Sequence, residues 1–247
     1  TGAAYQRQSI PLPVDNATEI ADALWQAVSP QTKVIYLSHI TSPTALIFPL
    51  EAICHRARQE GILTVIDGAH APGQIPLNLD ELGADFYTGN LHKWLCAPKG
   101  AAFLYARPER QALIEPLVVS WGWEPENTTL LSLPGAEASP FILHQEWQGT
   151  RDIAAYLSVP AAIRFQAAHD WDRVRQACHE LVRYARQAIG ELTGLEQICP
   201  DVDLRGLPDL RGLVLEVTQC PKLKASRSPR PRAGPCSTGW ANGPWTT

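Results

Sequence analysis

Two short stretches decide the fold of this chain: V-I-D-G-A-H at Val65–His70 and T-G-N-L-H-K-W at Thr88–Trp94. In the first, Asp67 ends an apolar run, Ile62–Ile66, that is typical of a buried parallel strand. In the second, Lys93 follows another strand-like run of the same kind. We therefore expect an acid and a lysine at neighbouring strand ends, the edge at which open parallel sheets bind their ligands.

An acid and a lysine in this arrangement suit pyridoxal phosphate chemistry. The amine of Lys93, which follows the run Ala84–Thr88, would form a Schiff base with the cofactor aldehyde. The carboxylate of Asp67 would keep the pyridine nitrogen protonated, so that the ring acts as an electron sink. The alternative is a surface lysine together with an aspartate that caps a helix. Two motifs in this order, each after a strand pattern, favour the cofactor hypothesis.

Strand and helix patterns alternate on both sides of the two motifs. The segment after Asp15–Asn16 predicts a capped amphipathic helix, Lys33–Leu37 a strand, Leu50–Glu60 a helix and Ala101–Tyr105 a further strand. This alternation predicts an α/β fold with a mainly parallel sheet flanked by helices.

Two long helical patterns follow a loop-rich segment. The first runs from Asp152 to about Phe165, and Pro160 predicts a kink within it. The second runs from Asp170 to Leu192, with apolar residues at helical spacing.

Composition argues against several classes of partner. A chain with 45% hydrophobic residues can bury a sizeable core, and a net charge of −4 gives no electrostatic reason to expect nucleic acid or an anionic membrane. No apolar run approaches the roughly 20 residues of a membrane span. Six scattered cysteines without a C-x-x-C pair favour reduced thiols in a cytoplasmic protein over disulfides. The histidines outside the motifs lack metal-ligand spacing, so we expect no metal: His55, His144, His169 and His179.

Four stretches carry a resemblance to a known family. They are S-H-I-T-S-P-T-A at Ser38–Ala45, D-G-A-H-A-P-G at Asp67–Gly73, G-A-D-F-Y-T-G-N-L-H-K-W at Gly83–Trp94, and W-Q-G-T-R-D at Trp147–Asp152. Up to about Leu215 the chain resembles class V aminotransferases, pyridoxal phosphate enzymes of fold type I. Within them it looks most like the isopenicillin N epimerase branch, with cysteine desulfurases, kynureninases and sulfoxide lyases as further relatives. The resemblance is specific for fold and cofactor and less specific for substrate.

The resemblance also implies a domain organisation. Residues 1–165 would form the cofactor-binding large domain, residues 166–220 the start of a small C-terminal α+β domain that is cut short, and residues 221–247 an irregular tail. A truncated or frameshifted end explains the basic cluster from Lys222 to Arg232 better than a nucleic-acid tail does. Relatives carry a long segment before this one, with a phosphate loop and a ring-stacking aromatic group. We therefore expect a fragment that binds pyridoxal phosphate weakly or not at all, and a catalytically inactive remnant is the non-enzyme alternative.

Individual catalytic roles follow from the same resemblance. Lys93 would hold the cofactor and then move the substrate α-proton, Asp67 would pair with the pyridine nitrogen, and His70 would reach the phenolic oxygen of the cofactor. A loop histidine with a backbone partner is the alternative for His70. Ser42 stands where desulfurases carry an asparagine against the same oxygen, a departure that puts this contact in doubt. The role of His39 stays open.

Phosphate binding is assigned to a second group of residues. Thr88, Asn90 and His92 match the phosphate-contacting stretch of the family. Thr150 matches a residue that crosses the interface of a homodimer to serve the cofactor phosphate of the partner subunit, and a helix N-cap is the alternative. Arg151 is a candidate for the substrate carboxylate or the phosphate, or else a surface arginine.

The expected activity is the pyridoxal phosphate-dependent conversion of an amino acid, most similar to isopenicillin N epimerase. A class V aminotransferase or a C–S lyase/cysteine desulfurase is the alternative enzyme, because these reactions share their first steps. A cysteine desulfurase needs a nucleophilic cysteine on a loop of the small domain, and Cys220 lies too early in the chain for that loop.

Overall fold

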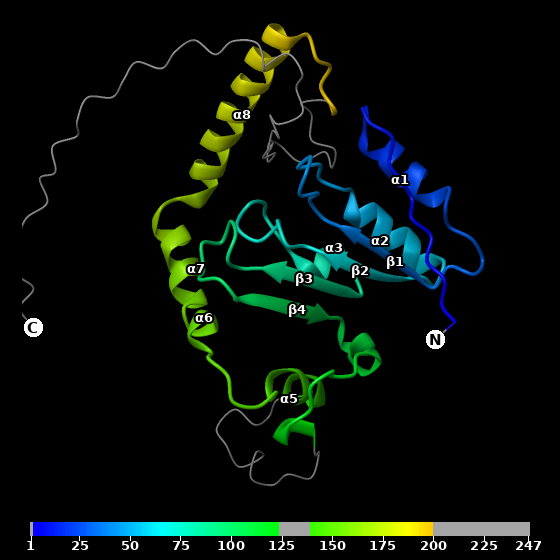
Figure 1. Ribbon diagram of the computed structural model, residues 1–247, viewed down its shortest axis with the longest axis vertical. Coiled ribbons are helices and arrows are strands. Elements are labelled where there is room, and N and C mark those ends of the chain that lie inside the picture. The colour runs from blue at the N-terminus through cyan, green and yellow to red at the C-terminus, as the bar shows by residue number, and fades with distance from the viewer. Residues whose placement is uncertain (1, 124–138, 200–247) are drawn as a thin grey trace, which may run out of the picture. The chain divides into compact units, whose positions relative to one another are not determined.

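The computed structural model describes residues 2–123 and 139–199, and in this part the strands form one four-stranded sheet. The strands are β1 (Val34–Ser38), β2 (Leu63–Asp67), β3 (Phe86–Asn90) and β4 (Ala102–Ala106), and they lie in that order in space (Figure 1). Strands β1, β2 and β3 pair in parallel, whereas β4 runs antiparallel to β3. An α/β fold with a mainly parallel sheet is confirmed. The fourth strand reverses direction because a loop, and no crossover helix, joins it to β3.

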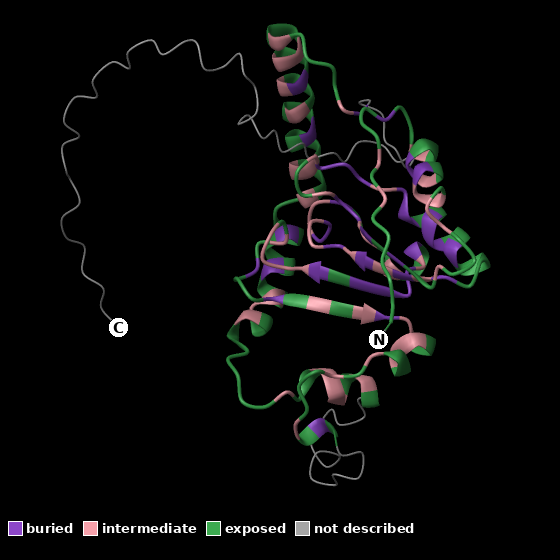
Figure 2. Ribbon diagram, turned by 45° about the vertical axis from the view of Figure 1, so that its right-hand side comes forward, coloured by how far each residue is buried: buried purple, intermediate pink, exposed green. Residues whose placement is uncertain are grey.

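One face of the sheet forms the main hydrophobic core. Alternate strand residues, among them Ile35, Leu37, Ile66 and Tyr87, point to this face and are buried. Helices α1 (Ala17–Trp25), α2 (Leu50–Gln59) and α3 (Leu79–Leu82) contribute apolar residues to the same cluster. Figure 2 shows these buried residues concentrated in the strands and in α2.

The strand residues that alternate with these buried ones point to the opposite face of the sheet, which is much more exposed. Val34 is 50% exposed, Tyr36 69% and Leu104 40%. Asp67 and Thr88 have the same parity as Tyr36 in the paired strands, so they lie on this open face.

The first helix begins where the sequence predicts. The side chain of Asn16 accepts a hydrogen bond from the backbone N–H of Glu19 at 3.0 Å, and the carboxylate of Glu19 accepts one from the backbone N–H of Asp15 at 2.9 Å. This reciprocal capping satisfies N–H groups that the helix itself leaves unpaired.

The second half of the described chain is helical. It contains α5 (Pro140–Glu146), α6 (Ala154–Leu157), α7 (Val159–Ala168) and α8 (Trp171–Thr193), and two short 3-10 helices, η1 (Pro108–Leu113) and η2 (Trp121–Trp123), precede it. The first predicted helix is interrupted at Ser158, two residues before Pro160, as expected for a proline that cannot donate a helical hydrogen bond. The second predicted helix is α8, which ends at Gly194 in the left-handed conformation.

Some sequence-based predictions fall outside the described residues. These are the strand expected at Leu213–Val217, Cys220 and the tail at 221–247. The division between a large and a small domain remains a prediction, and the proposed boundary at residue 165 lies within α7.

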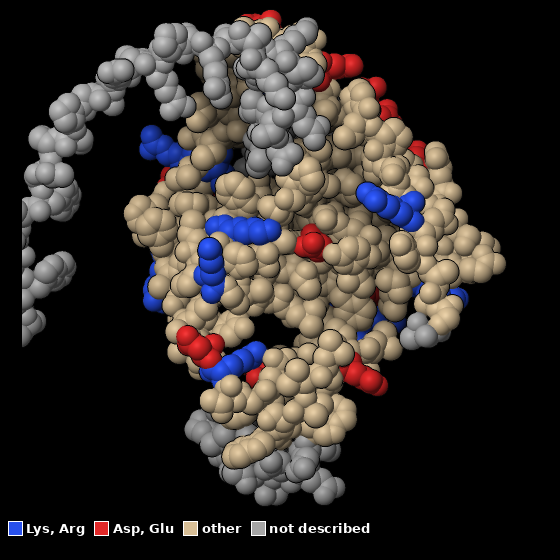
Figure 3. All heavy atoms as spheres, in the orientation of Figure 1, with Lys and Arg blue, Asp and Glu red and all other residues tan. Residues whose placement is uncertain are grey.

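The charged side chains on the surface and the apolar character of the helices bear on nucleic-acid and membrane partners. On the face that Figure 3 shows, both Lys and Arg side chains and Asp and Glu side chains are present. Among the described helices, none combines the length and the apolar character that crossing a membrane requires.

Candidate active site

The site is built where the parallel strands end. Ser38 pairs with Asp67, and Asp67 pairs with Thr88, so the carboxyl ends of β1, β2 and β3 lie side by side. The backbone continues this arrangement by one residue, because the N–H of His39 donates to the carbonyl of Asp67 at 2.9 Å and the N–H of Gly68 donates to that of Thr88 at 2.8 Å. Parallel strands therefore bring Asp67 and Thr88 to one edge of the sheet.

Asp67 is held by the turn that it starts. Its Oδ1 atom accepts a hydrogen bond from the backbone N–H of Ala69 at 2.9 Å, an Asx-type turn. The hydroxyl of Tyr36, two residues before Ser38 on the same open face, is a second partner of this carboxylate. Partial burial, the negative charge of Asp67 and this hydrogen bond raise the pKa of Tyr36, in that order of importance. The carboxylate of Asp67 is half-buried and keeps acceptor capacity for a ligand.

Lys93 and His70 lie in direct contact. The Nζ atom of Lys93 is 3.0 Å from Nε2 of His70, although 23 residues separate them in the chain. Burial lowers the pKa of His70, the positive charge of Lys93 lowers it further, and the charge of Asp67 opposes both. A neutral imidazole can accept a hydrogen bond from the ammonium group, so His70 orients the amine of Lys93.

The three residues expected at the phosphate occupy the end of β3 and the loop after it. Thr88 is exposed, and its hydroxyl lies 3.5 Å from the carbonyl of Ile66. Asn90 is half-buried at the last position of β3, where it pairs with Ala102. Nδ1 of His92 lies 3.3 Å from the carbonyl of Ala101, an arrangement that leaves its Nε2 for another partner. Neutral donors of this kind are suited to a phosphate group.

Ser42 and Thr150 do not join this group by any hydrogen bond within the described residues. Ser42 is exposed in the turn between the bridged residues Ile40 and Ile47. Thr150 is exposed after Gly149. The alternative role of Thr150 as a helix N-cap is wrong, because α6 begins at Ala154 with Ile153 as its cap residue.

Arg151 is engaged locally. Its guanidinium donates to the side chain of Gln148 and to the carbonyl of Glu146, and it lies over the ring of Tyr156. These contacts agree with the surface alternative for this arginine.

Two residues that sequence reasoning missed hold the motif loops together. Gln166 of α7 donates to the carbonyl of Trp94 at 2.8 Å, and Trp171 of α8 donates to the carbonyl of Gly73 at 2.9 Å. Gly73 has a φ of 82°, and a Cβ atom there would collide with the backbone of Trp94. The loop after Asp67 therefore packs against the loop that carries Lys93, and α7 and α8 fasten both. A long-range contact of this kind leaves no periodic signal in the sequence.

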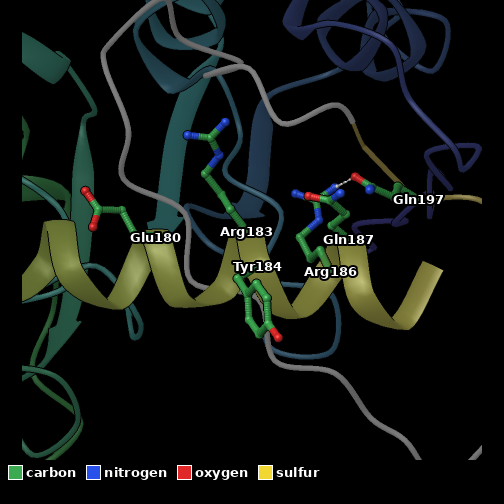
Figure 4. A pocket seen from close by; sticks show the side chains of 6 residues that line it. All are labelled: Glu180, Arg183, Tyr184, Arg186, Gln187 and Gln197. Carbon is green, nitrogen blue, oxygen red and sulfur yellow. Dashed lines mark hydrogen bonds between the residues drawn. The ribbon is translucent and has the colours of Figure 1, made fainter. Parts of the chain in front are cut away.

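A separate hollow of about 420 Å³ lies along α8 (Figure 4). Its lining residues are Glu180, Arg183, Tyr184, Arg186, Gln187 and Gln197, and none of the predicted site residues is among them. Arg186 is buried and donates to the side chain of Gln197 and the carbonyl of Cys199, a structural arrangement that ties the end of the described chain to the helix.

The chemistry of the strand-end residues fits pyridoxal phosphate. An amine for the aldehyde, a carboxylate with a free acceptor site for the pyridine nitrogen, an imidazole beside the amine and neutral donors for the phosphate lie on adjacent strands and their loops. In the described ranges, no group of three or more His, Cys, Asp and Glu side chains is arranged to hold a metal ion.

The mainly parallel sheet and its helices form an α/β fold of type I. The model of the class V aminotransferase family matches residues 6–207, so the chain belongs to that family, whose enzymes depend on pyridoxal phosphate.

Curated relatives agree with this assignment. The chain is 37% identical over 193 residues to isopenicillin N epimerase of Amycolatopsis lactamdurans and 40% identical over 194 residues to that of Streptomyces clavuligerus. These matches cover 76% and 77% of the chain and 48% of each relative, so the chain spans about half the length of the curated relatives it matches. It is also 28% identical to a probable L-cysteine desulfhydrase of Arabidopsis thaliana, over 87% of the chain and 46% of that relative.

Solved structures share the fold. A cysteine desulfurase of Escherichia coli superposes with a TM-score of 0.57 at 21% identity, over 69% of this chain and 41% of that one. The apo cysteine desulfurase of Thermococcus onnurineus NA1 superposes with a TM-score of 0.55 at 26% identity, over 71% and 42%. These likenesses confirm the expected fold type.

Proposed function

We propose that this chain is the catalytic core of a pyridoxal phosphate-dependent enzyme that acts on an amino acid in the manner of isopenicillin N epimerase. The contact of 3.0 Å between Lys93 and His70, beside the strand end that carries Asp67, is the observation on which the proposal depends. The identity of 37–40% to two isopenicillin N epimerases supports this reaction over others of the family. When bound, the cofactor would withdraw electrons from the substrate α-carbon.

The residues of the chain would divide the work as follows. Lys93 would attach the cofactor through a Schiff base and, once released by the substrate, carry the α-proton. The ionised carboxylate of Asp67 would keep the pyridine nitrogen protonated. His70, which orients the amine of Lys93, would also be close to the cofactor oxygen next to the aldehyde.

Cofactor phosphate binding is the second part of the proposal. Thr88, Asn90 and His92 would donate to the phosphate, and Ser42 would approach the cofactor from the end of β1. Thr150 would serve the neighbouring site of a homodimer, for which its exposure leaves it accessible.

A cytoplasmic location belongs to the same proposal, and the unpaired state of Cys54, Cys96, Cys178 and Cys199 supports it.

The L-cysteine desulfhydrases among the relatives make elimination, as in a C–S lyase, the second candidate reaction. Both reactions begin with removal of the α-proton, and they differ in whether a proton returns or a β-substituent leaves. Incubation with amino acids in deuterated water separates them. Incorporation of deuterium at the α-carbon with loss of optical purity indicates epimerisation, whereas release of sulfide from cysteine indicates elimination.

A titration with pyridoxal phosphate tests the proposal. Because this chain is expected to bind weakly, the titration extends to a large excess of cofactor. There we expect a visible absorption band in the wild-type chain and in the matched control Lys99→Ala, whose exposed lysine lies in the same loop. The band should be missing from Lys93→Ala. A band of equal strength in Lys93→Ala would refute the assignment of this lysine.

A further inference from the structure

On the buried face of the sheet, next to the strand end that carries Asp67, lie two polar side chains to which the proposed function gives no role. His39 and Tyr87 are both completely buried, and Nδ1 of His39 lies 2.8 Å from the hydroxyl of Tyr87. The two rings meet edge to face at a centroid distance of 5.9 Å. Tyr87 in turn stacks on Phe103 of β4 at 6.2 Å. A row of side chains therefore joins the end of β1 to β3 and β4.

The side chain of Tyr87, which contacts His39, lies against Gly68, the second residue of the Asp67–His70 turn. His39, Gly68 and Tyr87 belong to three adjacent strands or their continuations and point to the covered face. A Cβ atom at position 68 would overlap with the ring and hydroxyl of Tyr87. The glycine of the D-G-A-H motif thus leaves the space through which Tyr87 reaches His39.

The backbone of the same residues is fixed from both sides. The carbonyl of Asp67 accepts from the N–H of His39, and the N–H of Gly68 donates to the carbonyl of Thr88. The peptide unit between Asp67 and Gly68 is thereby bound to both neighbouring strands. Further along the turn, the N–H of Ala71 donates to the carbonyl of Gly68 at 3.0 Å. Movement at Gly68 would therefore displace the carboxylate of Asp67 and the imidazole of His70 together.

We propose that His39 and Tyr87 are positioning residues, whose hydrogen-bonded side chains hold the Asp67–His70 turn in the geometry that brings His70 to Lys93. The significance of that geometry for catalysis rests on the proposed function. The positioning itself can be measured without cofactor, so its failure is distinguishable from a failure of the proposed function.

Tyr87→Phe removes one hydroxyl and keeps the ring that stacks on Phe103. Tyr105→Phe is the matched control. Tyr105 lies opposite Tyr87 on the neighbouring strand β4, and its hydroxyl donates to the carboxylate of Asp80 in α3 at 3.1 Å. We expect the amides of Gly68 and Ala71 to exchange with deuterium about fivefold faster in Tyr87→Phe, the effect of losing one ordinary hydrogen bond. Exchange in α2 should stay unchanged, and the control should match the wild type throughout.

The pKa of His70 provides a readout that general destabilisation does not move. Burial and the charge of Lys93 lower this pKa in the intact turn. If the turn loosens, His70 becomes hydrated and separates from Lys93, so its pKa should rise toward the ordinary value in Tyr87→Phe. NMR titration, with the signal of His70 identified by its loss in His70→Asn, measures the change.

A second pair of variants keeps the test decisive if Tyr87→Phe does not fold. His39→Gln retains a side-chain group that can bond the hydroxyl of Tyr87, whereas His39→Leu does not. We expect fast exchange and a raised His70 pKa in His39→Leu, with both reversed in part in His39→Gln. Equal exchange and equal His70 pKa values in all variants would overturn the proposal. Acceleration spread evenly over α2 and the turn would overturn it as well, because it would indicate a purely structural role.

Discussion

Two aspartates on neighbouring strands, Asp67 and Asp85, show how one residue type performs opposite tasks at the two ends of a sheet. Asp67 is the last residue of β2, and Asp85 directly precedes β3. In a parallel sheet these positions lie at opposite edges. Asp85 is buried, with 4% of its surface exposed, whereas Asp67 is half-buried and opens toward the exposed face.

Both carboxylate oxygens of Asp85 have hydrogen-bond partners. One carboxylate oxygen accepts from the backbone N–H and the hydroxyl of Thr64 at 2.9 and 3.2 Å, and the other accepts from Nε of Arg110 at 2.9 Å. Arg107 adds a second positive charge at 3.7 Å. A buried carboxylate with this many partners has no acceptor capacity left for a ligand, so its role is to fasten β2, β3 and η1.

The carboxylate of Asp67 has fewer partners than that of Asp85. It has the N–H of Ala69 and the hydroxyl of Tyr36, and the positively charged neighbour of the turn, Lys93, contacts His70 instead. An acid at the carboxyl ends of the strands with spare acceptor capacity is therefore a ligand candidate, whereas an acid at the amino ends whose acceptor sites are all filled is structural.

The largest expected effect concerns stability and separates the two acids. Asp85→Ala leaves Arg110 and the groups of Thr64 without their buried partner, so the free energy of unfolding should fall by about 3–5 kcal/mol. Asp67→Ala should cost about 1 kcal/mol or less, the value of a turn hydrogen bond. Urea denaturation of both variants and of the wild type measures the difference. Equal losses would mean that Asp67 is as structural as Asp85.

The next effect concerns chemistry and should fall on Asp67 alone. Asp67→Asn should keep the fold and much of the bound cofactor but lose most exchange of the substrate α-proton. A neutral amide removes the charge that holds the pyridine nitrogen protonated, and such a charge is worth about 1–3 pKa units, or roughly tenfold to a thousandfold in the protonated form. Proton exchange followed by NMR in deuterated water measures the rate. Undiminished exchange would show that another group is the partner of the ring nitrogen.

The smallest expected effect concerns the hydroxyl of Tyr36, which contacts Asp67. The charge and hydrogen bond of Asp67 contribute to the raised pKa of Tyr36, after partial burial. In Asp67→Asn this pKa should therefore return part of the way toward its ordinary value. Tyr105 is the internal control, because burial and Asp80 raise its pKa and Asp67 takes no part. An unchanged Tyr36 pKa, measured by NMR titration, would show that the two side chains do not interact.

Much of this arrangement could be predicted from the sequence because the signals are local. The apolar run before Asp67, the alternation of strands and helices and the capping residues Asn16 and Glu19 all act within a few positions of the chain. The placement of Lys93 after a strand likewise follows from the residues next to it. Because β2 and β3 are neighbouring parallel strands, the loops that follow them bring His70 and Lys93 together.

The remainder depends on contacts between distant residues. The direction of β4, the hydrogen bonds from Gln166 and Trp171 to the motif loops and the buried pair of His39 and Tyr87 are set by tertiary packing. Propensity and periodicity do not record which side chains meet across a sheet. Thr150 shows the reverse case, where a plausible local role as a helix cap was wrong because the helix starts later.

The most direct test of the central claim is to locate the cofactor on the chain. The protein is incubated with pyridoxal phosphate, reduced with borohydride and cleaved into peptides for mass spectrometry. We predict that the pyridoxyl group is found on the peptide that contains Lys93, with Lys33 and Lys99 essentially unmodified, because Lys93 alone of these three lies beside His70 at the strand ends. Equal labelling of Lys33 or Lys99 would contradict the account.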